Sequence, residues 1–171
     1  MKPIAPLAAA LLLLAACHST PDRNRLIGDI DAHEQELATF NVAANEQKAH
    51  EMVALYRQFA THFPEDSLAP VYLMRSAEIF LNTGENENAV ALLDSVITLY
   101  PGFEEVAACL FLKGNAYENS QQYDLARETY TQFVADYPDH YLAEDTRKML
   151  PYIGLSPEEM LDAILNSAAD L

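Results

Sequence analysis

Residues 89–101 read AVALLDSVITLYP, and residues 126–138 read ARETYTQFVADYP. Both segments begin with alanine, carry apolar residues at helical spacing and end in tyrosine followed by proline. A third segment ends in the same way at Phe63-Pro64, and consecutive prolines of this kind are 37 residues apart. Proline cannot continue a helix, and it disfavours helical geometry in the residue before it. The pattern therefore predicts three helices that each end just before one of these prolines.

The same 37-residue register extends upstream of the prolines. One position of the register holds Tyr56, Leu93 and Tyr130, and another holds Phe59, Val96 and Phe133. Between the last two segments, Leu73 corresponds to Leu110, Phe80 to Tyr117 and Ala89 to Ala126. A fixed period of roughly 20–50 residues is typical of solenoids, in which each unit packs only on its neighbours.

These residues resemble the tetratricopeptide repeat, a helix-turn-helix unit in which small residues allow close helix crossing and large ones fill the gap to the next unit. In the unit that ends at Pro101, Ala77 and Ala89 are the small residues, Phe80 and Leu93 the large ones, and Gly84 the turn. The corresponding residues of the unit that ends at Pro138 are Gly114 and Ala126, Tyr117 and Tyr130, and the turn 119–121. The resemblance implies an all-α, right-handed superhelical solenoid of about three such units plus a C-terminal capping helix.

The solenoid domain is expected to cover residues 24–171, with units at about 24–64, 67–101 and 104–138 and a partial fourth unit and cap at 139–171. The first unit departs from the pattern, because Met52 stands where a small residue is usual. Near the C-terminus, Ser156 and Glu159 form a possible capping box that begins a helix with an apolar stripe. We expect this helix to cover the exposed end of the solenoid; the alternative is a helix that docks onto a partner.

The N-terminus indicates export. Lys2 is followed by an apolar run over residues 4–16, which at 13 residues is too short to span a bilayer. Residues 14–17, Leu-Ala-Ala-Cys, resemble the lipobox of bacterial lipoproteins. The resemblance implies a signal peptide at 1–16, cleavage before Cys17, lipidation of Cys17 and a short tether at 17–23. The alternative is an ordinary secretory signal that happens to contain a cysteine.

The composition excludes some partners. The chain of 171 residues has 26 acidic and 10 basic residues, with a net charge of −16. This charge disfavours binding to nucleic acid and to anionic lipid head groups, and it favours solubility or a basic partner. His18 follows Cys17, so the aspartate that retains some lipoproteins at the inner membrane is absent from that position. We therefore expect an outer-membrane protein that faces the periplasm.

No motif in the sequence indicates catalysis or a cofactor. The histidines at 18, 33, 50, 62 and 140 show no metal-ligand spacing on one helical face, so we expect no metal site. Cys109 lies in an apolar stretch and is expected to be a core residue. No glycine-rich phosphate loop or serine nucleophile motif is present. The sequence therefore predicts a protein that is not an enzyme.

Function is then expected to come from a surface. In tetratricopeptide proteins the first helices of successive units line a groove for an extended peptide or a partner's helix. The groove positions that the resemblance implies here are Val71, Met74, Glu78, Asn82, Ala108, Phe111, Asn115, Glu118 and Asn119. Side-chain amides can bind a peptide backbone, and Met74 and Phe111 can supply apolar contact. The alternative is that Met74 and Phe111 pack within the solenoid.

These observations predict a non-catalytic, lipid-anchored scaffold of the bacterial envelope that binds an envelope protein or a peptide segment. The 37-residue unit resembles those of periplasmic lipoproteins involved in envelope assembly, which implies a role in outer-membrane protein assembly or transport. The alternative is a lipoprotein that captures a peptide or a glycan, although the absence of tryptophan disfavours a glycan.

Overall fold

The computed structural model describes residues 22–37 and 45–169, and every extended regular element within these ranges is a helix. The all-α class is therefore confirmed. The helices are α1 (Arg23–Leu37), α2 (Glu46–His62), α3 (Leu68–Thr83), α4 (Asn86–Leu99), α5 (Val106–Asn119), α6 (Tyr123–Asp136), α7 (Ala143–Met149) and α8 (Pro157–Ala169).

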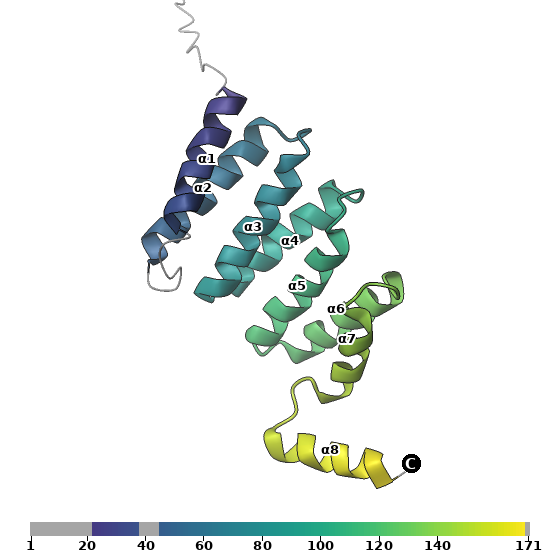
Figure 1. Cartoon of the computed structure of the whole chain (residues 1–171). Helices are drawn as coiled ribbons and strands as arrows, with labels where there is room; N and C mark the ends of the chain where they lie inside the picture. Colours follow the sequence, from purple (N-terminus) through teal and green to yellow (C-terminus); the bar gives the residue numbers. More distant parts are fainter. Residues whose placement is uncertain (1–21, 38–44, 170–171) are drawn as a thin grey trace, which may run out of the picture.

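The helices from α1 to α7 pack in chain order, each on the next. Figure 1 shows α1, α3 and α5 side by side in one layer and α2, α4 and α6 in a second layer behind it. Helix α3 also contacts α5, which joins consecutive hairpins within the first layer. This packing of consecutive helical hairpins is that of the predicted solenoid.

The aromatic residue before each repeat proline ends a helix in the same conformation. Phe63, Tyr100 and Tyr137 have φ of −128°, −127° and −127° and ψ of 58°, 57° and 59°. The backbone N–H of each still donates to the carbonyl four residues earlier. The proline that follows keeps its predecessor out of helical geometry, so all three helices end at the same point of the register.

The turns inside the second and third units also match. Gly84 ends α3 with φ of 80°, and Gln121, 37 residues later, has φ of 59°. The next residue in each turn donates to the carbonyl five residues earlier, Glu85 to Phe80 and Gln122 to Tyr117, both at 2.9 Å or less. The two turns therefore have the same backbone conformation, although only the first contains the glycine that suits a positive φ.

The core follows the small and large positions that the sequence predicts. Ala77, Ala89 and Ala126 are fully buried, and a Cβ added to Gly114 would collide with the ring of Tyr130. Phe80, Leu93 and Tyr130 are buried beside them. These residues are buried because α3 crosses α4, and α5 crosses α6, at close range.

The first unit reaches the same packing with different residues. Leu26 and Ile30 on α1 bury against Met52, Tyr56 and Phe59 on α2. Met52 is fully buried at the position where the other units have alanine. The departure of this unit from the repeat pattern thus lies in residue choice, and α1 still packs on α2.

Polar contacts attach the first unit to the second. Glu34 on α1 accepts a hydrogen bond from Tyr56 Oη on α2 at 2.6 Å and forms an ion pair with Arg75 on α3. Arg23 at the start of α1 pairs with Asp66, in the turn before α3. Three helices therefore share these contacts.

The C-terminal cap differs from the prediction. The capping box is present, since Ser156 N donates to Glu159 Oε2 at 2.8 Å and Glu159 N donates to Ser156 Oγ at 3.3 Å. However, α8 packs extensively on no other helix of the described chain, and its Met160, Leu161 and Leu165 are 37%, 56% and 60% exposed. Figure 1 shows α8 separate from the stack.

The end of the solenoid is covered instead by α7 and the short 3₁₀ helix Leu150–Tyr152. Ile153, which follows, is 3% exposed and packs with Ala126 and Tyr130 of α6. These residues cover the part of α6 around Ala126 and Tyr130 in place of α8. The expectation that the last helix caps the solenoid is corrected in this way.

The predicted signal peptide at 1–16, Cys17 and most of the predicted tether lie outside the described residues. Within the ranges that the structure covers, no helix is both long and apolar enough to span a bilayer.

Candidate partner-binding surface

The predicted groove residues lie on two helices that contact each other. Val71, Met74, Glu78 and Asn82 follow one face of α3, and Ala108, Phe111, Asn115, Glu118 and Asn119 follow one face of α5. None of the nine is fully buried; Asn82 and Asn119 are exposed, and the other seven are half-buried. The structure thus places the two sets on neighbouring helices of the first layer (Figure 1).

Met74 and Phe111, the two largest apolar groove residues, contribute to the solenoid core. The ring of Phe111 lies 5.4 Å from that of Tyr130 and 5.6 Å from that of Phe133, measured between centroids. Met74 is partly buried against the core formed by α3 and α4. These contacts favour the alternative that both residues pack within the solenoid.

The polar groove residues on α5 form hydrogen bonds within the solenoid. Asn119 Nδ2 donates to Asn115 Oδ1 at 3.1 Å, and Tyr130 Oη donates to Glu118 Oε2 at 3.2 Å. Burial raises the pKa of Tyr130, and the neighbouring Glu118 raises it further. On α5, the amide and carboxylate side chains that we expected to meet a peptide therefore already have partners in the free protein.

Glu78 makes the face of α3 acidic. Burial raises the pKa of Glu78, Arg75 opposes this, and the like charge of Glu105 adds to the rise. The nearby thiol of Cys109 is fully buried, and burial followed by the charges of Glu78 and Glu105 raises its pKa to about 12. Such a thiol is not a nucleophile at neutral pH, and its burial confirms the predicted core position.

A pocket of 510 Å³ lies elsewhere, at the edge of the solenoid where the turn after α2 meets the turn after α4. We call it the turn pocket. Its apolar lining comprises Pro64, Pro70, Leu99, Tyr100 and Phe103, and its acidic lining comprises Glu65, Asp66 and Glu104.

The turn pocket offers apolar surface beside negative charge. Leu99 is 67% exposed at the edge of the pocket, where the equivalent positions of the neighbouring repeats hold His62 and Asp136. Burial raises the pKa of Tyr100, and so does the charge of Glu65. Asp66 is engaged by Arg23, whereas Glu65 and Glu104 are exposed. This arrangement suits a partner's lysine or arginine, whose side chain has an apolar stem and a cationic end. It equally suits an apolar residue of the partner that stands next to a basic one.

The turn pocket was not predicted from the sequence. Phe63-Pro64 and Tyr100-Pro101 indicated helix ends only, although Phe103 and Pro70 add apolar residues to the same turns. The sequence feature that could have indicated the turn pocket is the presence of apolar residues on both sides of two successive repeat prolines. That these turns lie next to each other follows from the stacking of the units.

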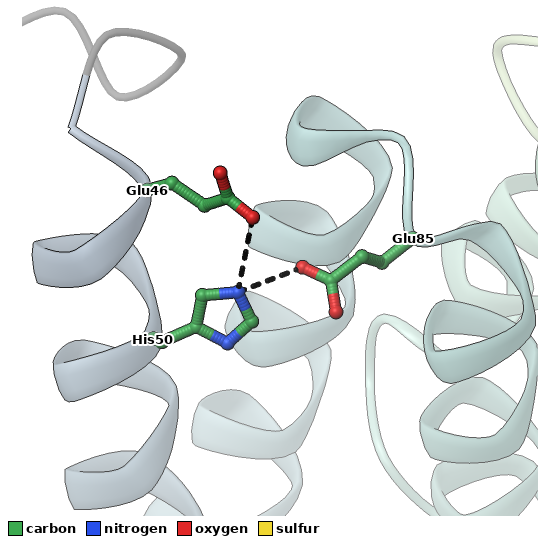
Figure 2. A group of neighbouring side chains, drawn as sticks. All are labelled: Glu46, His50 and Glu85. Atoms are coloured by element: carbon green, nitrogen blue, oxygen red, sulfur yellow. Dashed lines mark ion pairs between the residues drawn. The ribbon is translucent and has the colours of Figure 1, made fainter.

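One group of side chains within the described ranges combines metal-binding atoms. Glu46 and His50 on α2 lie close to Glu85, which precedes α4 (Figure 2). This group was not predicted from the sequence, although Glu46 and His50 have the i, i+4 spacing that places two side chains on one helical face. Glu85 is brought to them by tertiary packing alone.

The comparison with known protein families supports the fold and indicates the general function of such folds. Residues 72–102 and 108–140 are matched by the tetratricopeptide repeat family. These two segments are similar to tetratricopeptide repeats. The matches correspond to the hairpins α3–α4 and α5–α6, and they leave out the atypical first unit. A search of the curated proteins found no match.

Tetratricopeptide repeats are in general non-catalytic folds that bind protein partners. This agrees with the predicted scaffold at the level of the fold. Which partner this chain binds depends on its surface, because one fold serves many functions.

Proposed function

We propose that the chain is a lipid-anchored, non-catalytic scaffold of the bacterial envelope that binds a partner polypeptide at the turn pocket. The observation that carries the proposal is the pocket itself, an apolar hollow with an exposed leucine on a fold that generally binds proteins.

The chemistry of the turn pocket favours a basic partner segment. Glu65 and Glu104 lie beside the apolar lining, and the chain as a whole carries a net charge of −16. A partner that places a lysine or arginine beside an apolar anchor residue would gain both burial and charge complementarity. The groove on α3 and α5 is the weaker candidate, because most of its side chains are already engaged.

The anchor and the location form a second part of the proposal. The apolar run at 4–16, the Leu-Ala-Ala-Cys segment and His18 support lipidation of Cys17 and placement in the outer membrane, facing the periplasm. We propose that the scaffold acts there in the assembly or transport of outer-membrane proteins. Multiple acyl chains on one cysteine would hold the protein firmly, since each buried CH₂ contributes about 0.8 kcal/mol.

Site-specific crosslinking in intact cells tests the partner surface. A photo-crosslinking phenylalanine analogue is placed at Leu99 in the turn pocket, at Asn82 on the groove, and at the exposed Glu128 on α6 as a control. We expect a protein adduct from position 99, identified by mass spectrometry, and none from 128. Adducts from position 82 alone would move the partner site to the groove, and equal labelling at all three would contradict a specific site.

Metabolic labelling with an alkyne analogue of palmitate tests the anchor. The wild-type chain should take up the label and fractionate with the outer membrane, and the Cys17→Ser variant should take up none. Labelling of both would contradict lipidation at Cys17. Removal of the protein by protease added to intact cells would contradict the periplasmic orientation.

A further inference from the structure

We infer that Glu46, His50 and Glu85 form a binding site for a divalent transition-metal ion of the Zn²⁺ class. The site is separate from the turn pocket, and the inference does not depend on the proposed scaffold function.

The three side chains already converge. His50 Nε2 lies 3.0 Å from Glu85 Oε1 and 3.9 Å from Glu46 Oε1, and the three donor atoms all lie within 4.8 Å of one another. Figure 2 shows both carboxylates directed at the same ring nitrogen. Zn²⁺ binds imidazole nitrogen and carboxylate oxygen at about 2.0–2.2 Å, so its ligand atoms are a little over 3 Å apart in a tetrahedral site. Small rotations of the glutamates reach that geometry.

Neighbouring residues hold two of the ligands in place. Thr83 Oγ1 donates to Glu85 Oε1 at 2.9 Å, and Asn88 Nδ2 donates to Glu85 Oε2 at 2.9 Å. The ring of His50 packs edge-on against Phe80, with centroids 6.0 Å apart. Such outer contacts orient metal ligands and add to affinity.

The hydrogen-bond partners of His50 differ from those of the other two histidines on α1 and α2. His33 Nδ1 bonds the carbonyl of Asp29 at 2.7 Å, and His62 Nδ1 bonds that of Gln58 at 2.8 Å, each within its own helix. His50 instead directs Nε2 at two carboxylates from different parts of the chain. This contrast provides matched control histidines in the same region of the fold.

The donor set selects the class of ion. One imidazole and two carboxylates suit Zn²⁺ and its first-row neighbours, whereas Mg²⁺ and Ca²⁺ prefer oxygen donors alone. The two carboxylates balance the charge of a divalent ion. Glu46 and His50 are exposed, so water can fill the remaining coordination positions.

A bound ion would join two units of the solenoid. Glu46 and His50 belong to the first turns of α2, and Glu85 belongs to the turn between α3 and α4. An ion that binds only when these segments are packed together stabilises the folded state by mass action. The atypical first unit would thereby be clamped to the first of the two tetratricopeptide repeats.

The test uses the full chain in detergent, carrying an affinity tag without histidine and freed of metal by a chelator. Zn²⁺ is titrated in competition with a chromogenic chelator, and Co²⁺ is added separately to record its visible absorption. We expect one ion per chain, a rise in melting temperature on adding Zn²⁺, and a Co²⁺ spectrum typical of nitrogen and oxygen ligands.

Variants separate this site from chance binding. His50→Gln and Glu85→Gln should each weaken Zn²⁺ binding by at least about tenfold and abolish the thermal shift, and Thr83→Ala should weaken it less. The matched controls His62→Gln and Glu51→Gln, on the same helix, should bind as the wild type does. All variants are checked by circular dichroism and melting without metal, because His50 is on the surface and its loss should leave the fold intact.

Three results would overturn the inference. They are no binding by the wild type at millimolar Zn²⁺, equal binding by wild type and His50→Gln, and equal preference for Mg²⁺ or Ca²⁺. The first or third would leave Glu46, His50 and Glu85 as a surface ion-pair cluster, and the second would place the ion elsewhere.

Discussion

Gly114 on α5 lies directly against the ring of Tyr130 on α6: a Cβ added to Gly114 would be 2.6 Å from Cε1 of Tyr130. The preceding repeat has Ala77 and Leu93 at the same two positions, 37 residues earlier, and both are fully buried. The smaller Gly114 thus packs against the larger Tyr130, and the larger Ala77 is paired with the smaller Leu93. The helix crossing has a constant volume that each repeat divides differently.

This relationship predicts the effect of Gly114→Ala. The added methyl group meets a buried ring that cannot move aside, so the substitution should destabilise the fold by about 1–3 kcal/mol despite the better helix propensity of alanine. Urea unfolding followed by circular dichroism measures the change. In a Tyr130→Leu background the cost of Gly114→Ala should shrink markedly, because that pair then matches Ala77 and Leu93. Equal costs in both backgrounds would contradict the volume argument.

The second prediction concerns the turn after α5. Gln121 has a positive φ of 59° where the preceding repeat has Gly84. A residue with a side chain is strained in this region by about 1–2 kcal/mol, part of which glycine loses again through the greater freedom of its unfolded chain. Gln121→Gly should therefore raise the free energy of unfolding by somewhat less than about 1 kcal/mol. Gly84→Gln is the matched reverse change and should lower stability. A loss of stability in Gln121→Gly would show that its side chain makes contacts that outweigh the strain.

The third prediction is a pH dependence caused by Glu78. Its pKa is raised in the folded protein, first by burial, so the ionised carboxylate costs folding free energy at neutral pH. The cost disappears when the pH falls below the pKa of the unfolded chain, where Glu78 is protonated in both states. Glu78→Gln should therefore raise the melting temperature at pH 7 and leave it nearly unchanged near pH 4. Glu104→Gln, at an exposed position, serves as the control. A lower melting temperature for Glu78→Gln at pH 7 would mean that its attraction to Arg75 outweighs burial.

The fourth prediction concerns the reactivity of Cys109. The thiol is fully buried, and its pKa is raised to about 12 by burial and then by Glu78 and Glu105. In a Cys17→Ser background, where Cys109 is the only thiol, a disulfide reagent at pH 8 should react slowly with the native protein and at once in denaturant. Rapid reaction of the native protein would contradict the burial of α5 against α4.

The repeat architecture could be predicted from the sequence because it depends on local chemistry repeated at one spacing. The residues before Pro64, Pro101 and Pro138 end their helices in the same backbone conformation, because proline restricts the residue that precedes it. The small residues Ala77, Ala89 and Gly114 predicted the positions where the two helices of each unit cross closely. The capping box at Ser156 likewise began a helix where it was predicted.

The position of the last helix and the binding surfaces could not be predicted in the same way. The apolar stripe on α8 shows that one face of this helix is suited to burial. It does not show whether another residue already covers the surface of α6, and in the structure Ile153 covers part of it. Phe111 was a groove candidate from its register position, yet it fills the space beside Tyr130 and Phe133.

The sequence by itself therefore determined the helices, their ends and their 37-residue period, since these follow from backbone geometry and from the spacing of small, large and proline residues. Only the tertiary structure decided that Leu99 borders a pocket, that Glu85 meets His50 and that α8 stands apart. The physical reason is that spacing along a helix specifies which face a side chain occupies. Which distant residues share that space depends on how the packed helices fill their common volume.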